Sequence, residues 1–307
     1  MTVMTSFHRA VSTSVAAILA LALMSSVSQA QQSFPSPEDA AAALAVAVKS
    51  GPRDVLKVLG RAADDIVSSG DEVADADTRL RFTSMYDAKH SIKAEGNKKA
   101  TLMLGADDFP FPIPLVNTRT GWVFDADEGR IEVLYRRIGR NELDAIQTCL
   151  AYVDAQNEYA DKDRGEGGGV YAQRIVSTPG KKDGLFWRDD SDPSPLGALV
   201  AEAAAEGYKA GDKPAPYHGY YFRILKAQGS DAPGGTLNYV VKDKMIGGFA
   251  LIAWPAEYGN SGVKTFLVSH VGTVYEKDLG KSTDFFAKRL ILFDPDQTWK
   301  KVDAAKP

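Results

Sequence analysis

The sequence predicts an α+β fold in which helices and an antiparallel sheet occupy different stretches of the chain. Helix start and stop signals recur before residue 210, and from residue 220 the apolar residues switch to a period of two in consecutive short segments. Helices followed by a run of strands with Gly-rich turns are typical of α+β proteins. The composition, with 44% apolar residues, is that of a globular protein with a hydrophobic core.

The first 30 residues predict a secretory signal. A positively charged start precedes an apolar run over 15–24, and small residues lead to an expected cut after Ala30. The apolar run is shorter than the ~20 residues that span a bilayer, and no cysteine marks a lipoprotein cut. We therefore expect a periplasmic or secreted protein without a transmembrane segment after cleavage. The alternative is an uncleaved N-terminal anchor.

Composition bounds the remaining chain. It suggests two α+β domains, over residues 31–138 and 139–307. The net charge of −4 becomes −5 without Arg9, and a mildly acidic chain with no basic stripe is not expected to bind nucleic acid. Cys149 is the only cysteine, so no intrachain disulfide can form. We expect it to be a small buried residue in a helix, and no nearby histidine supports the alternative of a reactive thiol.

The first predicted domain opens with two helices. Ser36 is the expected N-cap, with proline at the first helical position, of a helix that runs to Val48. A second helix covers 53–59, and residues 61–98 give no assignment. Strands are expected over the four stretches that follow, with alternate prolines marking the second as an edge or an extended connector. These stretches are 99–104, 107–115, 120–125 and 130–136, the last two joined by a turn at 127–129.

The second predicted domain begins with an amphipathic helix. Asn141 is its expected N-cap, with Asp144 at the third position and apolar residues at 3–4 spacing up to Ala160. Ser194 caps a further helix over 195–206 that Gly207 stops. A hairpin turn at 270–272 and a last helix over 284–292 are also expected. Strands are predicted over 220–226, 237–242, 249–254, 264–269 and 273–277.

Distinctive phrases in this sequence resemble a known family. They are Ile138-Gly139-Arg140-Asn141-Glu142, Ala155-Gln156-x-x-Tyr159, Asp183-Gly184-Leu185-Phe186-Trp187, His218-Gly219-Tyr220-Tyr221 and Gly247-Gly248-Phe249-Ala250-Leu251. Together they resemble the bacterial secreted family known as domain of unknown function 2950, across nearly the whole mature chain. That family implies no activity.

Residues 142–276 also resemble the soluble head of type IV pilins and type II secretion pseudopilins. The counterparts are the Ala155–Tyr159 phrase, Tyr171-Ala172, the helix ending at Gly207, Gly219-Tyr220-Tyr221-Phe222, Ala253-Trp254-Pro255, and the hairpin from Gly262 to Val274. The resemblance implies a long helix packed on an antiparallel sheet. Pilins start with a long apolar helix after a peptidase-cut glycine, whereas this chain has an ordinary signal and about 100 residues ahead of the comparable helix.

Known catalytic signatures are absent from the sequence. It has no His-Glu-x-x-His, no phosphate-binding loop, no Gly-x-Ser-x-Gly and no paired cysteine ligands. The Gly-rich stretch 165–169 follows a helix and so does not suit a dinucleotide. We therefore expect a non-enzymatic binding or assembly factor of the bacterial envelope, whose partner is an envelope protein or a small ligand. The alternative is a periplasmic, hydrolase-like enzyme with its site near His218.

Six residues are candidates for ligand binding. His218 lies among aromatic residues at a strand entry, where it could bind a ligand or simply pack and bond to the backbone. Arg137 and Glu142 belong to a segment that could form an anion site or a structural clasp, with Glu142 or Asp144 as partners of Arg136 or Arg137. The aromatic content suggests an exposed recognition patch or a core. The full set is His218, Tyr220, Trp187, Asp183, Arg137 and Glu142.

One loop has part of the pattern of a calcium-binding loop. Asp161, Asp163 and Glu166 alternate as the oxygen donors that open a calcium loop do. Calcium takes six to eight oxygens, and position five here is glycine. We expect a solvated loop and no cofactor, with calcium as the alternative.

Overall fold

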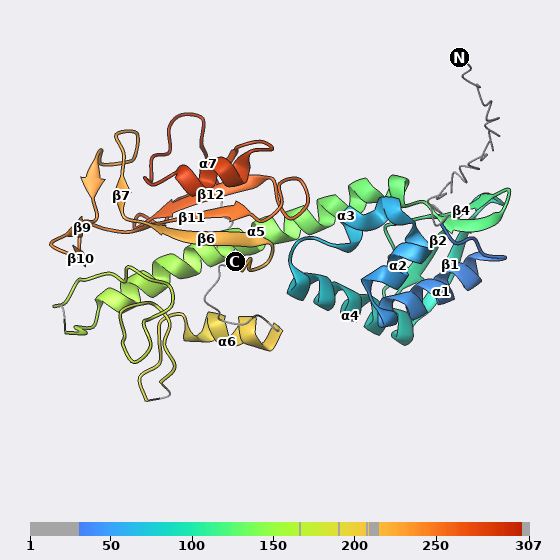
Figure 1. The fold of residues 1–307 in the computed structure, drawn as a ribbon, viewed down its shortest axis with the longest axis horizontal. Helices are drawn as coiled ribbons and strands as arrows, with labels where there is room; N and C mark the ends of the chain where they lie inside the picture. Colours follow the sequence, from blue (N-terminus) through green and yellow to red (C-terminus); the bar gives the residue numbers. More distant parts are fainter. Residues whose placement is uncertain (1–30, 166, 190, 207, 209–214, 303–307) are drawn as a thin grey trace, which may run out of the picture. The chain divides into compact units, whose positions relative to one another are not determined.

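The structure is a computed structural model that describes residues 31–165, 167–189, 191–206, 208 and 215–302. Residues 31–307 form one compact unit, and the predicted signal over 1–30 lies outside the described residues. Helices and antiparallel sheets make up this unit, which confirms the α+β class (Figure 1). None of the described helices is long and apolar enough to cross a membrane.

The N-terminal helices form where their capping residues predict them. Ser36 caps α1 (Pro37–Ser50) by accepting a hydrogen bond from the backbone N–H of Asp39 at 3.0 Å. Next come α2 (Pro52–Leu59), a 3₁₀ turn (Arg61–Ala63), α3 (Asp64–Val67) and α4 (Glu72–Ala88). Asp71 caps α4, a helix that the sequence left unassigned because its apolar residues form no continuous stripe and none of them is fully buried.

The helices of the first half pack on a small antiparallel sheet. Its strands follow the order β1-β2-β4-β5, and β3 pairs with β2. Pro110 lies in the edge strand β3, which pairs only with β2, and Pro112 and Pro114 follow it in a connection outside the strands. The bounds are β1 (His90–Glu95), β2 (Lys99–Leu104), β3 (Phe109–Pro110), β4 (Leu115–Thr118) and β5 (Gly121–Phe124).

The predicted strand over 130–136 and its turn at 127–129 are wrong. A single helix, α5 (Ala126–Ala160), runs through both segments, and Asp125 caps it with two acids in the first turn. Asn141 is therefore not an N-cap but a buried residue in the middle of this helix. The spacing of the apolar residues does not show one long helix, because α5 contacts different neighbours along its length. Its apolar residues therefore follow no single stripe.

In the second half of the chain, α5 packs against the main sheet. In Figure 1 this sheet lies above α5. The sheet is antiparallel with the order β14-β13-β12-β11-β6. The predicted segment 237–242 is broken into β8 and β9, and the last helix is shorter than expected. The bounds are α6 (Gly197–Glu206), β6 (Tyr220–Leu225), β7 (Ala227–Gln228), β8 (Leu237–Asn238), β9 (Val240–Val241), β10 (Lys244–Met245), β11 (Ala250–Pro255), β12 (Lys264–Ser269), β13 (Val274–Asp278), α7 (Thr283–Arg289) and β14 (Lys300–Lys301).

Each half of the chain has its own hydrophobic core. One large core draws its buried residues from 145–299, and smaller clusters draw theirs from 34–126. The predicted boundary at 138/139 falls inside α5, which contributes buried residues to both cores. A continuous helix thus links the two halves without a flexible linker.

Candidate functional site

A cavity of about 510 Å³ lies where α1, α2, α4 and the middle of α5 meet. More than half of the residues that line it are apolar, among them Leu44, Val48, Leu59, Phe82 and Phe111. This volume and this lining are those of sites that hold one small organic molecule, which range over roughly 300–1,000 Å³. The cavity is therefore a candidate site for such a ligand.

His218 lines this cavity and joins two elements of the second half. Its Nδ1 lies 2.8 Å from Asp144 Oδ2 on α5, and its Nε2 lies 2.8 Å from Glu206 Oε2 on α6. Burial lowers the pKa of His218, but the hydrogen bonds to these two carboxylates and their charges outweigh it and raise the pKa to about 9. The imidazole is therefore protonated near neutral pH and donates both of its N–H groups.

The backbone around His218 is held by a buried carboxylate. Asp71, which is 2% exposed, accepts hydrogen bonds at its Oδ2 from the backbone N–H of Gly219 at 2.9 Å and the hydroxyl of Tyr208 at 2.8 Å. Its Oδ1 caps α4. Burial and the charge of Asp71 raise the pKa of Tyr208 far above its usual value, so this phenol stays a donor. His218 has φ +48°, an uncommon conformation that this network holds in place.

Arg137 links the two halves of the chain, whereas Glu142 fixes the start of β12 within the second half. The Arg137 guanidinium donates to the carbonyls of Asp65 at 2.9 Å and Ile66 at 2.5 Å, and to the side chain of Asn260. Burial lowers the pKa of this guanidinium. Glu142 Oε1 accepts the backbone N–H groups of Val263 and Lys264, each at 3.0 Å.

The expected pairing of these arginines with Glu142 or Asp144 does not form. Arg136 pairs with Glu132 one turn earlier in α5, at 2.6 Å. Asp144 pairs with His218, and Glu142 accepts a hydrogen bond at the start of β12 instead of pairing with an arginine. A separate strand and helix, as the sequence predicts, would not show this. In the continuous helix α5, Glu142 lies about 140° around the axis from Arg137, and Asp144 lies on the same face but about 10 Å further along.

Tyr220 and Asp183 both make hydrogen bonds within the fold. Tyr220 is fully buried, and its hydroxyl donates to the carbonyl of Lys264 at 2.9 Å. Asp183 accepts hydrogen bonds from the backbone N–H and the hydroxyl of Thr178, both at 2.7 Å, and so closes a turn. Neither residue lines the cavity.

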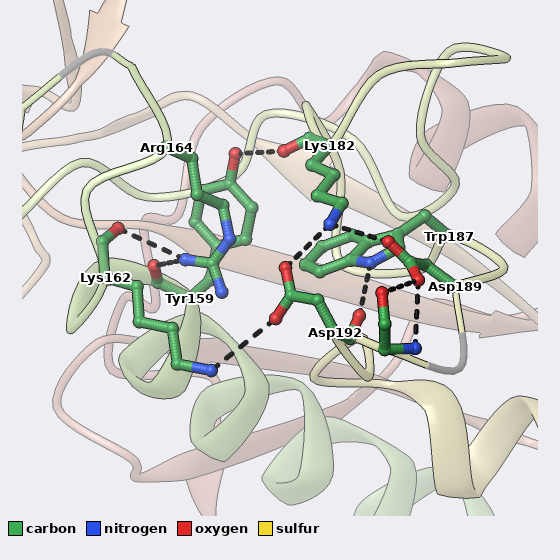
Figure 2. Close-up of polar contacts among 8 residues, drawn as sticks. Tyr159, Lys162, Arg164, Lys182, Trp187, Asp189 and Asp192 are labelled. Carbon is green, nitrogen blue, oxygen red and sulfur yellow. Dashed lines mark hydrogen bonds and ion pairs between the residues drawn. The ribbon is translucent and has the colours of Figure 1, made fainter.

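Trp187 lies in a separate cluster of polar and aromatic side chains at the end of α5 (Figure 2). Its indole N–H donates to the carbonyl of Asp192 at 2.8 Å, and the guanidinium of Arg164 stacks over the rings of Trp187 and Tyr159. Figure 2 shows Lys182 between two carboxylates, with Nζ 2.9 Å from Asp189 and 2.8 Å from Asp192. The cluster fastens loops to α5 and lies outside the cavity lining.

The predicted calcium loop is only partly described. Asp163 Oδ1 accepts the backbone N–H groups of Gly165 and Gly167, at 2.8 and 2.9 Å, and Glu166 lies outside the described residues. Asp161 follows the C-terminus of α5. Within the described part of the chain, no group of three or more His, Cys, Asp and Glu side chains could hold a metal ion. The calcium alternative stays a prediction.

The comparison that decides the family covers most of the chain. The family model described as "Protein of unknown function (DUF2950)" matches residues 31–302. The chain belongs to this family. No curated protein and no solved structure matches the chain, so the likeness to pilin heads stays a prediction.

The cavity of this DUF2950 protein depends on residues that the sequence did not single out. Asp71, Tyr208 and Glu206 hold the segment around His218, and α4 supplies one wall. Asp71 and Gly219 are 148 positions apart, and no local pattern connects them. The signal that could have located Asp71 is its place as an N-cap, with an acid in the first turn of α4.

Proposed function

We propose that this DUF2950 protein is an exported, non-enzymatic binding protein of the bacterial envelope that takes an elongated, largely apolar ligand in the cavity beside α4 and α5. The cavity itself carries the proposal, because a space of about 510 Å³ with apolar walls is costly to leave open to water. The signal-like N-terminus supports export.

The geometry of His218 favours binding over catalysis. A general base needs a free nitrogen that can accept a proton from a substrate. Both ring nitrogens of His218 instead face carboxylates at 2.8 Å, and its pKa of about 9 keeps it protonated. His218 is therefore poorly suited to be the general base of a hydrolase. It links α5 and α6 through its positive charge and its two hydrogen bonds.

Binding of a neutral, environment-sensitive fluorophore such as N-phenyl-1-naphthylamine tests the proposal. The mature protein is expected to enhance its fluorescence with saturation, and V48W to abolish most of this enhancement, because Val48 lines the cavity. V46W is the matched control, since Val46 lies on the same helix, is 66% exposed and does not line the cavity. Equal binding by wild type and V48W, or none by wild type, would contradict the proposal.

We also propose that the second half resembles a pilin head and acts in envelope assembly. Support comes from the packing of α5 on β11, β12 and β13 of an antiparallel sheet. Crosslinking of the exported protein in intact cells checks this idea: a crosslink to a pilin or pseudopilin subunit would support it. Crosslinks only to unrelated proteins would contradict it. Peptide mass spectrometry of the same sample should find Gln31 as the mature N-terminus.

A further inference from the structure

The charges that line the cavity do not balance. Five arginines and the protonated His218 face four carboxylates, although the whole chain carries a net charge of −4. Two further carboxylates lie beside the lining and offset part of this excess: Glu132 pairs with Arg136, and Asp71 holds Tyr208 and Gly219. The positive charge that a ligand could use therefore depends on which arginines have no partner within the fold.

Each carboxylate of the lining has a partner within the fold. Asp75 accepts the backbone N–H of Ser69 at 3.0 Å, and Asp77 pairs with Arg81 at 2.6 Å. Asp144 and Glu206 both hold His218. These four acids are therefore occupied and offer little to a cationic ligand.

Two of the arginines remain available. Arg136 pairs with Glu132, and Arg137 is used by backbone carbonyls. In the part of the chain that the structure describes, the guanidinium groups of Arg79 on α4 and Arg140 on α5 have no hydrogen-bond or ion-pair partner. Both line the same cavity as the apolar walls, and they come from two different helices.

We propose that the cavity selects a single-chain amphipathic anion, such as a long-chain fatty acid, whose head group is held by Arg79 and Arg140. A guanidinium binds carboxylate or phosphate oxygens through paired, charge-assisted hydrogen bonds. The apolar walls take the chain, and the volume suits one drug-sized ligand more than a two-chain lipid. His218 adds positive charge but no hydrogen bond, because Asp144 and Glu206 occupy both of its N–H groups. This inference rests on the proposed binding function.

Competition against the bound fluorophore tests the inference with three ligands of equal chain length: oleate, oleyl alcohol and oleylamine. Oleate is expected to bind roughly tenfold or more tightly than the alcohol, and the amine more weakly than either. In the double variant R79Q/R140Q the preference for oleate over the alcohol should fall to about twofold or less. The preference should also weaken as salt is raised.

The matched control is R53Q/R61Q, which removes two arginines that do not line the cavity and should keep the full preference. Melting curves of both double variants check that they fold. If the fluorophore and the alcohol bind but oleate has no advantage, the anion inference fails and the binding function stands. If no apolar probe binds, the binding function fails first.

The source of the anion is tested with the same protein. Lysophosphatidic acid offers a phosphate on one chain, and vesicles of phosphatidylglycerol offer a two-chain anionic surface. Competition by oleate or by lysophosphatidic acid, lost in R79Q/R140Q, supports the single-chain anion and shows which head group is preferred. Binding to the vesicles without competition by either single-chain ligand would overturn it.

Discussion

The carboxylate of Asp71 accepts a hydrogen bond from the backbone N–H of Gly219 at 2.9 Å, across 148 positions of the chain. Asp71 caps α4 of the first half, and Gly219 precedes β6 of the second half. This contact and the bond from Tyr208 tie one wall of the cavity to the segment that carries His218. A buried carboxylate with four donors thus joins the two halves beside the cavity.

Asp71→Asn is expected to destabilise the fold by about 2–4 kcal/mol. The amide would present its own donor to Gly219 N–H or Tyr208 hydroxyl, which leaves buried donors without an acceptor. Urea denaturation followed by circular dichroism measures the change. Asp77→Asn is the control, since Asp77 is 44% exposed in an ion pair within α4 and should cost less than about 0.5 kcal/mol. A loss at Asp71 no larger than at Asp77 would contradict the buried network.

Gly219→Ala is expected to cost more than the same change at Gly272. Both glycines have positive φ, +74° and +78°, so both substitutions strain the backbone by about 1 kcal/mol. At Gly219 an added Cβ would also lie 2.6 Å from Asn141 Nδ2 and 2.9 Å from Ser261 Cβ, whereas at Gly272 it meets nothing within 4 Å. The difference in unfolding free energy, expected at about 1–3 kcal/mol, measures this close approach. Equal losses at the two positions would show that the turn can relax.

The stability of the protein should depend on pH through His218. Its pKa is about 9 in the folded state against an ordinary 6.5, so the folded protein keeps a proton that the unfolded chain releases between these values. The stabilisation is complete below about pH 6.5 and is lost as pH rises through 9. The stability advantage of wild type over His218→Gln should therefore shrink by roughly 1–3 kcal/mol between pH 6 and pH 9.5.

His90 provides the control for this pH dependence. It stacks on Tyr86 and lies away from Asp144 and Glu206. His90→Gln also removes one histidine but leaves the contacts of His218 with Asp144 and Glu206 in place, so this variant should keep the loss of stability that His218 causes as pH rises to 9.5. If His218→Gln retained the same pH dependence as wild type, the raised pKa of His218 would be refuted.

Cys149 should not react in the folded protein. It is fully buried on α5, and burial raises the pKa of its thiol to about 12, so almost no thiolate exists at pH 8. Incubation with iodoacetamide at pH 8, followed by intact-mass measurement, should show no adduct in native protein and one adduct in urea. One adduct per chain in native protein would mean that the α5 core opens readily.

Much of the fold follows from local sequence signals. Ser36 and the following proline place the start of α1, and the alternation of apolar residues predicts β6, β11 and β12 within one residue. The apolar residues of segment 130–136 also suit a short strand, and only the packing of this segment on the 3₁₀ turn Arg61–Ala63 and on α3 reveals the helix. α4 was missed because it has no buried stripe.

The residues of the candidate site could likewise be predicted only in part from the sequence. The sequence by itself determined the α+β class, the family, the isolated buried cysteine and the interest of His218 among aromatic residues, because each depends on local order along the chain. Tertiary structure alone decided that Asp71, Asp144, Glu206 and Tyr208 surround His218, and that Arg79 and Arg140 share one cavity. These residues come from α4, α5, α6 and the segment before β6, which hydrogen bonds join. Bonds such as those of Asp71 cross more than a hundred positions and leave no periodic trace in the sequence.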